Sequence, residues 1–250
     1  MLAAERRQMI IDIANKDKRV LVSELSHKFQ VTEETIRRDL EKLEKEGVLT
    51  RTYGGAIMNR HSNEDLPFYT RHATNLHIKQ EIAQKALSYI HNGDTLMMDP
   101  STSSIELLKI LNMRQGLTVI TSSIILQEFA ASGHQIISTG GTLRAPSMSL
   151  VGTVAHETAR KYHVDKFIMS CKALSLDHGI MDSNEAECEL KRKMIQQAEQ
   201  VILLADHTKF DRTAFVHLSH FDNIDVVITD QEPSDPWKQL FQEHEIELIY

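Results

Sequence analysis

The sequence predicts an α/β protein in two parts: a small N-terminal winged helix-turn-helix and a larger C-terminal α/β domain. Residues 1–60 show three short helical patterns followed by a strand-like alternation. From residue 74 onward, apolar strand patterns alternate with helical patterns, which is typical of βαβ units and a mostly parallel sheet. The charge also differs, since residues 1–60 hold twelve Lys or Arg against ten Asp or Glu, whereas the rest holds 16 against 25. Net charges of +2 and −9 favour two domains with different partners.

The composition excludes several classes of protein. With 250 residues, 41% of them hydrophobic, the chain can bury a sizeable core, so it is neither disordered nor a disulfide-stapled miniprotein. Its two cysteines, Cys171 and Cys188, are expected to be reduced thiols. No stretch resembles a signal peptide or reaches the ~18–20 apolar residues of a membrane helix, so we expect a cytoplasmic protein with no membrane partner.

Three helices and a hairpin are predicted in the N-terminal part. An apolar face supports a first helix that ends near Asn15, and Ser23 is the expected N-cap of a short second helix. Thr32 begins a third helix, with acidic residues in its first turn, where the helix dipole favours them. Gly47 ends that helix, and residues 48–53 alternate in the manner of a strand. This order predicts a helix-turn-helix over about 20–39 and a wing over about 48–57, the whole domain covering 1–58.

The third helix is the candidate DNA reader. In a helix-turn-helix the second helix enters the major groove and presents its N-terminal residues to base edges. The residues expected at the base edges are Thr32, Glu34, Thr35 and Arg38, and those expected at phosphates are Arg37, Lys42 and the wing residue Arg51. The alternative is a solvated amphipathic helix whose acidic and basic residues pair at i,i+4.

A resemblance strengthens the first interpretation. Residues 31–40 read V-T-E-E-T-I-R-R-D-L, followed by Leu43, Gly47, Leu49, Arg51 and G-G-A at 54–56. This string resembles the N-terminal signature of the DeoR/GlpR family of bacterial transcriptional regulators. The resemblance implies a sequence-specific repressor domain that binds operator double-stranded DNA, and it adds Tyr53 and Gly54 to the candidate DNA-binding residues. We expect Asp39 to hold an arginine in place rather than to contact a base.

The C-terminal part, 74–250, is expected to begin after a linker over 59–73, because residues 59–67 read N-R-H-S-N-E-D-L-P. Helices are predicted over 74–91 and 124–131, and strands over 95–98, 117–120, 135–138, 166–170, 201–205 and 226–229. Polar turns follow successive strands, and ligands bind at that edge of open α/β sheets. The first turn provides Asp99, Ser101, Thr102, Ser103 and Ser104 before a helix, where backbone N–H groups attract anions. A second provides Thr121, Ser122 and Ser123, although serine and threonine are also ordinary N-caps.

The resemblance to DeoR/GlpR regulators extends over this part, through G-D-T-x-x-x-D-x-x-T at 93–102 and G-G-T-L-R at 140–144. It implies a sensor domain akin to sugar-phosphate isomerases of the ribose-phosphate isomerase kind, which binds a phosphorylated sugar. Two departures are notable: Ser101 replaces the family's glycine, and Lys172 brings an additional cation to the site. The D-S-N-E stretch at 182–185 resembles a subgroup tied to deoxysugars, which suggests a ketose 1-phosphate such as rhamnulose or fuculose phosphate. The further effector candidates are Gly140, Gly141, Arg144, Lys172, Asp182, Glu185, Lys191, Asp206 and Lys209.

Two functions compete for this sequence. One is a repressor of a sugar catabolic operon, relieved by a phosphorylated sugar; symmetric half-sites would require a homo-oligomer, a dimer or a tetramer. The other is an isomerase-like enzyme with a fused DNA-binding domain, because Asp182, Glu185, Glu187 and Lys191 are suitable acid–base residues. The DNA-binding signature favours the regulator, so we expect no enzymatic activity, and we expect neither a cofactor nor a metal, since the histidines and cysteines show no ligand spacing.

Overall fold

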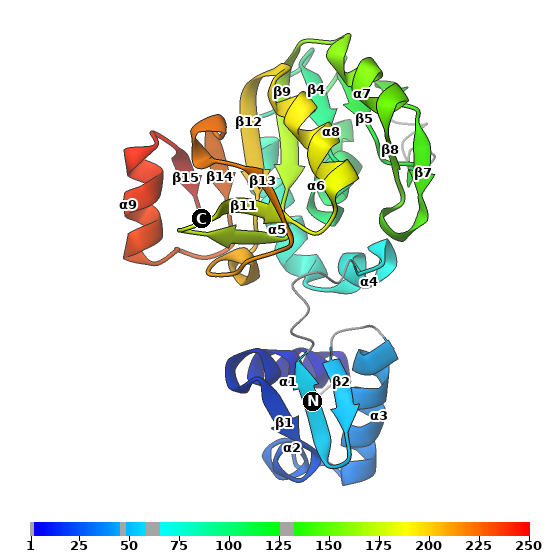
Figure 1. Cartoon of the computed structure of the whole chain (residues 1–250), viewed down its shortest axis with the longest axis vertical. Coiled ribbons are helices and arrows are strands. Elements are labelled where there is room, and N and C mark those ends of the chain that lie inside the picture. The colour runs from blue at the N-terminus through cyan, green and yellow to red at the C-terminus, as the bar shows by residue number, and fades with distance from the viewer. Residues whose placement is uncertain (1–2, 46–48, 59–65, 126–132) are drawn as a thin grey trace. The chain divides into compact units, whose positions relative to one another are not determined.

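The computed structural model describes residues 3–45, 49–58, 66–125 and 133–250, and the chain divides into two compact units, Met1–His61 and Ser62–Tyr250 (Figure 1). The first unit contains α1 (Ala3–Asp17), β1 (Arg19–Leu21), α2 (Val22–Phe29), α3 (Glu33–Lys45), β2 (Leu49–Thr52) and β3 (Gly55–Met58). Its three strands form an antiparallel sheet in the order β1-β3-β2. These elements form the winged helix-turn-helix that the sequence predicts.

The core of the first unit is formed by one apolar face from each helix together with the sheet. Ile10 of α1, Leu25 of α2 and Ile36 and Leu40 of α3 are all at most 2% exposed. Their spacing along α3 is the i, i+4 repeat of an amphipathic helix. Burying these side chains stabilises each helix by tertiary packing, which short helices require.

The structure corrects several boundaries in this unit. Helix α2 begins at Val22 with Leu21 as its N-cap, so the prediction that Ser23 caps it is wrong. Strand β1 was not predicted, because three residues are too few to show an alternation. Its partner β3 requires Gly55, since a Cβ there would lie 1.9 Å from the carbonyl oxygen of Val20. The expected helix stop at Gly47 lies outside the described residues.

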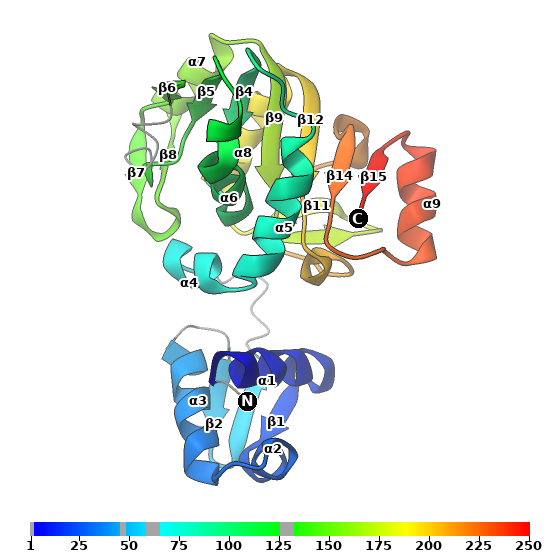
Figure 2. The same ribbon diagram turned by 180° about the vertical axis from the view of Figure 1, so that it is seen from behind.

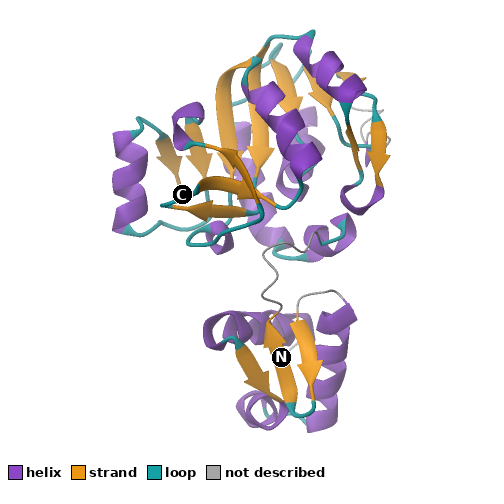
Figure 3. Ribbon diagram, in the orientation of Figure 1, coloured by secondary structure: helices purple, strands orange, loops and turns teal. Residues whose placement is uncertain are grey.

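The second unit is built on a parallel sheet of seven described strands in the order β15-β14-β12-β9-β4-β5-β6 (Figure 3). These strands are β4 (Thr95–Met98), β5 (Thr118–Thr121), β6 (Gln135–Ser138), β9 (Val164–Ser170), β12 (Ala198–Leu204), β14 (Val226–Ile228) and β15 (Glu247–Ile249). Its helices are α4 (Phe68–Ala73), α5 (Leu76–Leu87), α6 (Thr102–Ile110), α7 (Thr153–Arg160), α8 (Glu185–Ile195) and α9 (Asp235–Glu243). Two small antiparallel sheets pair β7 (Thr142–Arg144) with β8 (Ser149–Val151), and β10 (Ala173–Ser175) with β11 (Gly179–Asp182) and β13 (Val216–Ser219).

Helices cover both faces of the large sheet, and each face has its own hydrophobic core. Helices α7, α8 and α9 pack on one face, against strand residues such as Met97 and Phe167. Helices α5 and α6 pack on the other face, against Met98 and Ile168, as Figure 2 shows from behind. Neighbouring residues of one strand thus enter opposite cores, as the alternation of side chains along a strand requires.

The strand order reverses direction between β4 and β9. From β4 the sheet continues through β5 and β6 on one side, and from β9 through β12, β14 and β15 on the other. All six pairings in this sheet are parallel. Crossover connections therefore leave β4 and β9 toward opposite sides, and ligands of open α/β sheets bind at such a switch point, beyond the carboxyl ends of the strands.

The predicted linker over 59–73 needs correction at its C-terminal end. Residues 68–73 form α4, and Phe68 is only 3% exposed because its ring packs in the core shared with α5 and α6. The short helix has too few turns to show a helical period in the sequence. The predicted helix over 124–131 lies mostly outside the described residues.

Candidate functional site

On the DNA-reading candidate helix α3, charged side chains are exposed and locally paired. The Thr32 hydroxyl accepts a hydrogen bond from the Thr35 N–H at 3.2 Å, so Thr32 caps the helix as predicted. Arg37 pairs with Glu33 at 2.6 Å and Arg38 with Glu34 at 3.2 Å, both at i,i+4. These are the pairs of the alternative interpretation. Because they are solvent-exposed, however, they are weak and leave the arginines able to exchange carboxylate for phosphate or base contacts.

The remaining candidates of the first unit lie on α3 and the wing. Lys42 is exposed on α3, and the Arg51 side chain on β2 pairs with Glu44 at 2.6 Å. This contact lowers the pKa of Glu44, chiefly through the hydrogen bond from the Arg51 backbone N–H, and raises the pKa of Arg51. Tyr53 and Gly54 form the exposed turn between β2 and β3, and the Tyr53 ring is fully exposed.

Asp39 points into the first unit rather than outward. Its carboxylate accepts a hydrogen bond from Arg6 Nε at 2.6 Å and lies 3.5 Å from Arg7 Nη1. Arg6 and Asp39 are 8% and 5% exposed. The expectation that Asp39 holds an arginine is therefore confirmed, and the arginine it holds belongs to α1, which fixes α1 against α3.

In the second unit, a pocket lies beyond the carboxyl ends of β4 and β9, at the switch point of the sheet. It is lined by α4 and α5, by the loop into α6, by the segments after β9 and β11, and by the turn η4 (His207–Lys209). Of the predicted effector residues it brings together Ser101, Thr102, Ser103, Lys172, Asp182, Lys191, Asp206 and Lys209. At the N-terminus of α6, the Ser104 N–H donates to the Ser101 hydroxyl and the Ser101 N–H to Asp99, so the N–H groups of Thr102 and Ser103 are the candidate donors to an anion.

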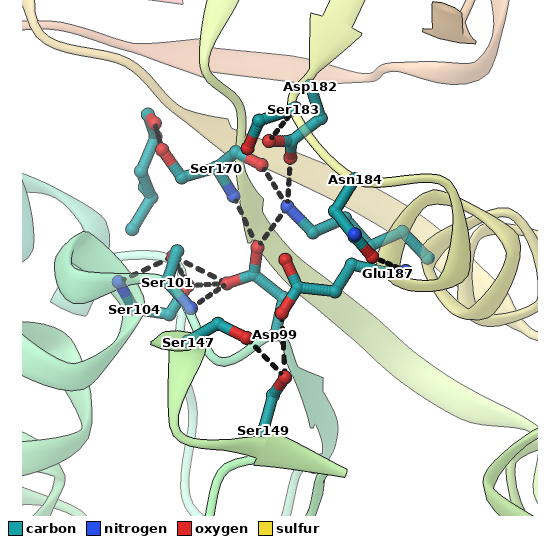
Figure 4. A network of polar contacts seen from close by, with 12 residues as sticks. Asp99, Ser101, Ser104, Ser147, Ser149, Ser170, Asp182, Ser183, Asn184 and Glu187 are labelled. Carbon is teal, nitrogen blue, oxygen red and sulfur yellow. Dashed lines mark hydrogen bonds and ion pairs between the residues drawn. The ribbon is translucent and has the colours of Figure 1, made fainter. Parts of the chain in front are cut away.

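The floor of the pocket is a buried ion-pair triad (Figure 4). Lys191 Nζ lies 2.9 Å from Asp99 Oδ2 and 2.8 Å from Asp182 Oδ2, and it donates to the Ser170 carbonyl oxygen at 2.8 Å. Asp99 also accepts hydrogen bonds from the hydroxyls of Ser101 and Ser104, at 2.5 and 2.6 Å. Asp99 and Ser104 therefore support the pocket from behind rather than line it.

The triad fixes the charge of its members. Burial favours the neutral form of Lys191, but Asp182 and Asp99 outweigh it and raise the pKa of Lys191 well above its usual value. Burial likewise opposes the ionised form of Asp182, yet Lys191 lowers the pKa of this carboxyl. A lysine bonded to two carboxylates and a carbonyl has used its donors, so it shapes the pocket and does not supply free positive charge.

Besides Lys191, the basic side chains that line the pocket are Arg71, Lys79, Lys172 and Lys209, of which Lys79 is buried and has a pKa lowered by that burial to about 7. Arg71 donates to the Leu66 carbonyl oxygen at 3.1 Å, and Lys209 lies 4.0 Å from Asp206. Burial raises the pKa of Asp206, but Lys209 and the Thr208 hydroxyl outweigh it and lower that pKa. A partly enclosed site with this surplus of cations suits an anionic ligand.

A chain of hydroxyl groups enters the pocket from the side. Glu187 accepts a hydrogen bond from the Ser149 hydroxyl at 2.6 Å, and Ser149 bonds to Ser147 at 2.8 Å (Figure 4). Ser147 in turn accepts from Arg144 Nη1 at 2.8 Å. Arg144 is thus linked to the pocket through this chain but does not line it. Glu187 lines it and provides a carboxylate that can accept hydrogen bonds.

Several predicted effector residues do not line the pocket. The Thr121 and Ser123 hydroxyls accept hydrogen bonds from backbone N–H groups two residues on, at 3.1 and 3.2 Å, so both hydroxyls are bonded to the backbone of their own turn. Ser122, Gly140 and Gly141 also lie outside the pocket lining. At Gly141 a Cβ would lie 2.5 Å from the Val151 carbonyl oxygen, so close packing requires this glycine.

Glu185, a predicted effector residue, is exposed at the start of α8 and does not line the pocket, whereas Glu187 does. Asn184 caps α8 by accepting from the Glu187 N–H at 3.2 Å, and from that cap Glu187 and Lys191 lie one turn apart on the inner face. Residues two apart on a helix face different directions, which separates Glu185 from them. The i,i+4 spacing of Glu187 and Lys191 was the signal that could have identified this face.

Sequence reasoning missed the pocket residues contributed by α4 and α5. Arg71 and Lys79 line it, as do Thr74 and Asn75, together with Ser170, Cys171 and Thr208. The position of α4 depends on tertiary packing, which no local pattern shows. Both cysteines are free thiols, and burial raises the pKa of each to about 12, which makes them unreactive near neutral pH. Among the described residues, no cluster of three His, Cys, Asp or Glu side chains offers a metal site.

Comparison with known proteins assigns both units. Residues 6–62 match the model of the DeoR-like helix-turn-helix domain, and residues 74–231 match that of the DeoR C-terminal sensor domain. The chain belongs to the DeoR family of transcriptional regulators. It is 41% identical to the uncharacterized HTH-type transcriptional regulator YulB of Bacillus subtilis, covering 92% of this chain and 90% of that protein. It is 36% identical to the HTH-type transcriptional repressor GlcR of the same organism, covering 100% and 96%.

This DeoR-family chain is therefore a DNA-binding transcriptional regulator and not an enzyme, and the first unit is its DNA-binding domain. Ribose 5-phosphate isomerase A from Methanocaldococcus jannaschii superposes with a TM-score of 0.42 and 11% identity, over 55% of each chain. A likeness of this size carries no functional argument. Within the described residues, none of the helices has the length and apolar character needed to cross a membrane.

Proposed function

We propose that this DeoR-family regulator is a repressor of a sugar catabolic operon and that a phosphorylated sugar bound in the pocket of the second unit releases it from operator DNA. The observation that carries the proposal is the pocket at the switch point, where the N-terminus of α6 meets Arg71, Lys79 and Lys209. A phosphate dianion fits this combination of helix N–H groups and cations. The relative named as a repressor, GlcR, supports the direction of the response.

The sugar part of the ligand would bind to the polar residues of the same pocket. Asp182, Ser183 and Glu187 line it, and they offer hydrogen-bond acceptors to hydroxyl groups. Asp182 and Ser183 come from the D-S-N-E stretch, on which we base the narrower proposal of a ketose 1-phosphate such as rhamnulose or fuculose 1-phosphate. Operator half-sites related by a two-fold axis would be read by a dimer or tetramer of the chain.

A mobility-shift titration tests the proposal. The full chain is bound to the DNA upstream of its own gene and titrated with free sugars and with their phosphates, including rhamnulose 1-phosphate, fuculose 1-phosphate and ribose 5-phosphate. We expect a phosphorylated sugar, and not its free form, to weaken DNA binding by roughly 5–150-fold. Lys209→Ala should reduce this response, whereas Lys238→Ala, on the surface helix α9, should not. If no phosphorylated sugar changes the affinity for DNA, the proposed function is wrong.

A further inference from the structure

Helix α4 is the first described element of the second unit, and two polar contacts hold it to the walls of the pocket. On one side, His72 Nε2 lies 2.9 Å from Glu106 Oε1 of α6, and the same carboxylate accepts from Gln80 of α5 at 3.1 Å. On the other side, Lys79 of α5 donates to the carbonyl oxygens of Arg71 and Thr74. Both carbonyls belong to the C-terminal end of α4 and the residue after it.

Lys79 has an unusual position for a lysine. It is only 5% exposed, yet it lines the pocket, and no carboxylate lies within ion-pair distance of it among the described contacts. The charged groups that face it are Arg71 of α4, Glu106 of α6, and Asp206 and Lys209 of η4. Two of its N–H donors are committed to α4, at 2.6 Å for the Thr74 carbonyl oxygen.

An ammonium group has three donors, whereas a neutral amine has two donors and a lone pair. Two of the N–H donors of Lys79 are directed at α4. The protonation state of the amine therefore decides whether it presents a third N–H donor or a lone pair to the pocket. Burial, with Lys209 next in effect, lowers the pKa of Lys79 to about 7. An anion in the pocket favours the charged form, because opposite charges at short distance stabilise each other. The charged form also donates stronger hydrogen bonds to the two carbonyls.

We propose that Lys79 is a positioning residue that couples an anion in the pocket to α4, by dividing its three donors between the anion and the carbonyl oxygens of Arg71 and Thr74. This inference rests on the proposed function, since it requires the pocket to bind a phosphate ester. Filling the pocket then tightens the C-terminal end of α4. Because α4 follows the DNA-binding unit along the chain, this is the segment through which occupancy of the pocket can be transmitted.

Hydrogen exchange separates this role from simple binding. The probe is methyl phosphate, a phosphate monoester without a sugar, titrated at pH 8 onto the full chain, with binding measured by calorimetry and amide exchange measured over residues 67–75. We expect saturating probe to slow exchange of α4 in the wild-type protein. Lys79→Met should weaken binding by about 10–100-fold, the loss of a charge-assisted hydrogen bond, and leave α4 exchange unchanged even at saturation.

Two other lysines provide the controls. Lys209→Met should weaken binding but still show slowed α4 exchange once the probe is saturating. Lys85→Met, on the same helix as Lys79 but bonded to the Thr229 carbonyl oxygen, should alter neither quantity. Lys79→Gln, which retains a polar end, replaces Lys79→Met should the latter fail to fold.

Proton uptake gives a second readout. At pH 8 the probe is already a dianion, since its second pKa is about 6. A Lys79 amine with a pKa of about 7 is then mostly neutral, so binding should take up close to one proton in the wild type and much less in Lys79→Met. Calorimetry in two buffers of different ionisation enthalpy measures this number.

The outcomes distinguish the two proposals. If Lys79→Met at saturation protects α4 as the wild type does, or binds the probe without loss of proton uptake, the role of Lys79 is refuted while the pocket remains a phosphate site. If neither methyl phosphate nor any sugar phosphate binds the wild type, the proposed function and this inference fail together.

Discussion

Both units of the chain contain ion pairs, but those on α3 are exposed to solvent and those beneath the pocket are buried. On α3 the side chains of Arg37 and Arg38 are 55% and 77% exposed beside their glutamates, whereas the Lys191 side chain is 7% exposed between Asp99 and Asp182. Water screens the exposed pairs, so they contribute little to folding and are easily exchanged for contacts with DNA. The buried charges have no such alternative and fix the floor of the pocket. The exposed arginines are therefore available to contact DNA, whereas the buried lysine holds the structure of the pocket.

The largest expected effect comes from removing the buried cation. Lys191→Met leaves Asp99 and Asp182 buried without their partner, so the free energy of unfolding of the second unit should fall by about 3–5 kcal/mol. Urea unfolding followed by circular dichroism measures this change. Lys238→Met is the control: this half-buried lysine pairs with Glu232 and Asp235 at the surface, so its loss should cost less than about 1 kcal/mol. A loss below about 1 kcal/mol would mean that the triad is not held as tightly as its distances indicate.

Acid should act on the same triad. The pKa of Asp182 is lowered in the folded chain, so its contribution to stability is present above its usual value of 3.8 and is lost as pH falls through the lower folded value. The unfolding midpoint of the wild type should therefore decrease as the pH falls below about 4. Asp182→Asn should be less stable at neutral pH and show a smaller further decrease over this range. Parallel curves for the two proteins would contradict the assignment.

On the exposed side, Arg38→Ala should affect binding and not folding. Loss of a base contact costs about 1–3 kcal/mol of binding free energy and relaxes specificity at one position of the operator. Its neighbour Arg37→Ala, at a predicted phosphate contact, should weaken binding to all sequences alike. Competition binding with operator variants measures both. If Arg38→Ala keeps the specificity of the wild type, Arg38 is not a base-reading residue.

The smallest expected effect is at the wing. Arg51 is predicted to contact a phosphate, and its present partner Glu44 is half-buried at the surface. Arg51→Ala should lower the slope of log affinity against log salt concentration by about one, with little change in specificity. Arg114→Ala, in the second unit, is the control and should retain the slope.

The sequence predicted correctly those features that are determined by residues close together along the chain. The apolar repeat of α3 and the polar loop Asp99–Ser104 after β4 lie within one or two elements, and both were located correctly. Arg71 and Lys79 reach the pocket through the tertiary packing of α4 and α5, which no spacing along the chain shows. The Thr121–Ser123 turn is rich in hydroxyl groups like the pocket loop, but Thr121 and Ser123 bond to the backbone of their own turn and do not line the pocket. Composition therefore identified two candidate loops, and the order of the strands in the sheet determined which of them lines the pocket.

The exposed ring of Tyr53 has a practical consequence. Because its side chain is fully exposed, its replacement removes no packing from the fold, so a change at this position should alter association with DNA rather than stability. The tip of the wing is thus a place where a spectroscopic label can be attached without loss of packing.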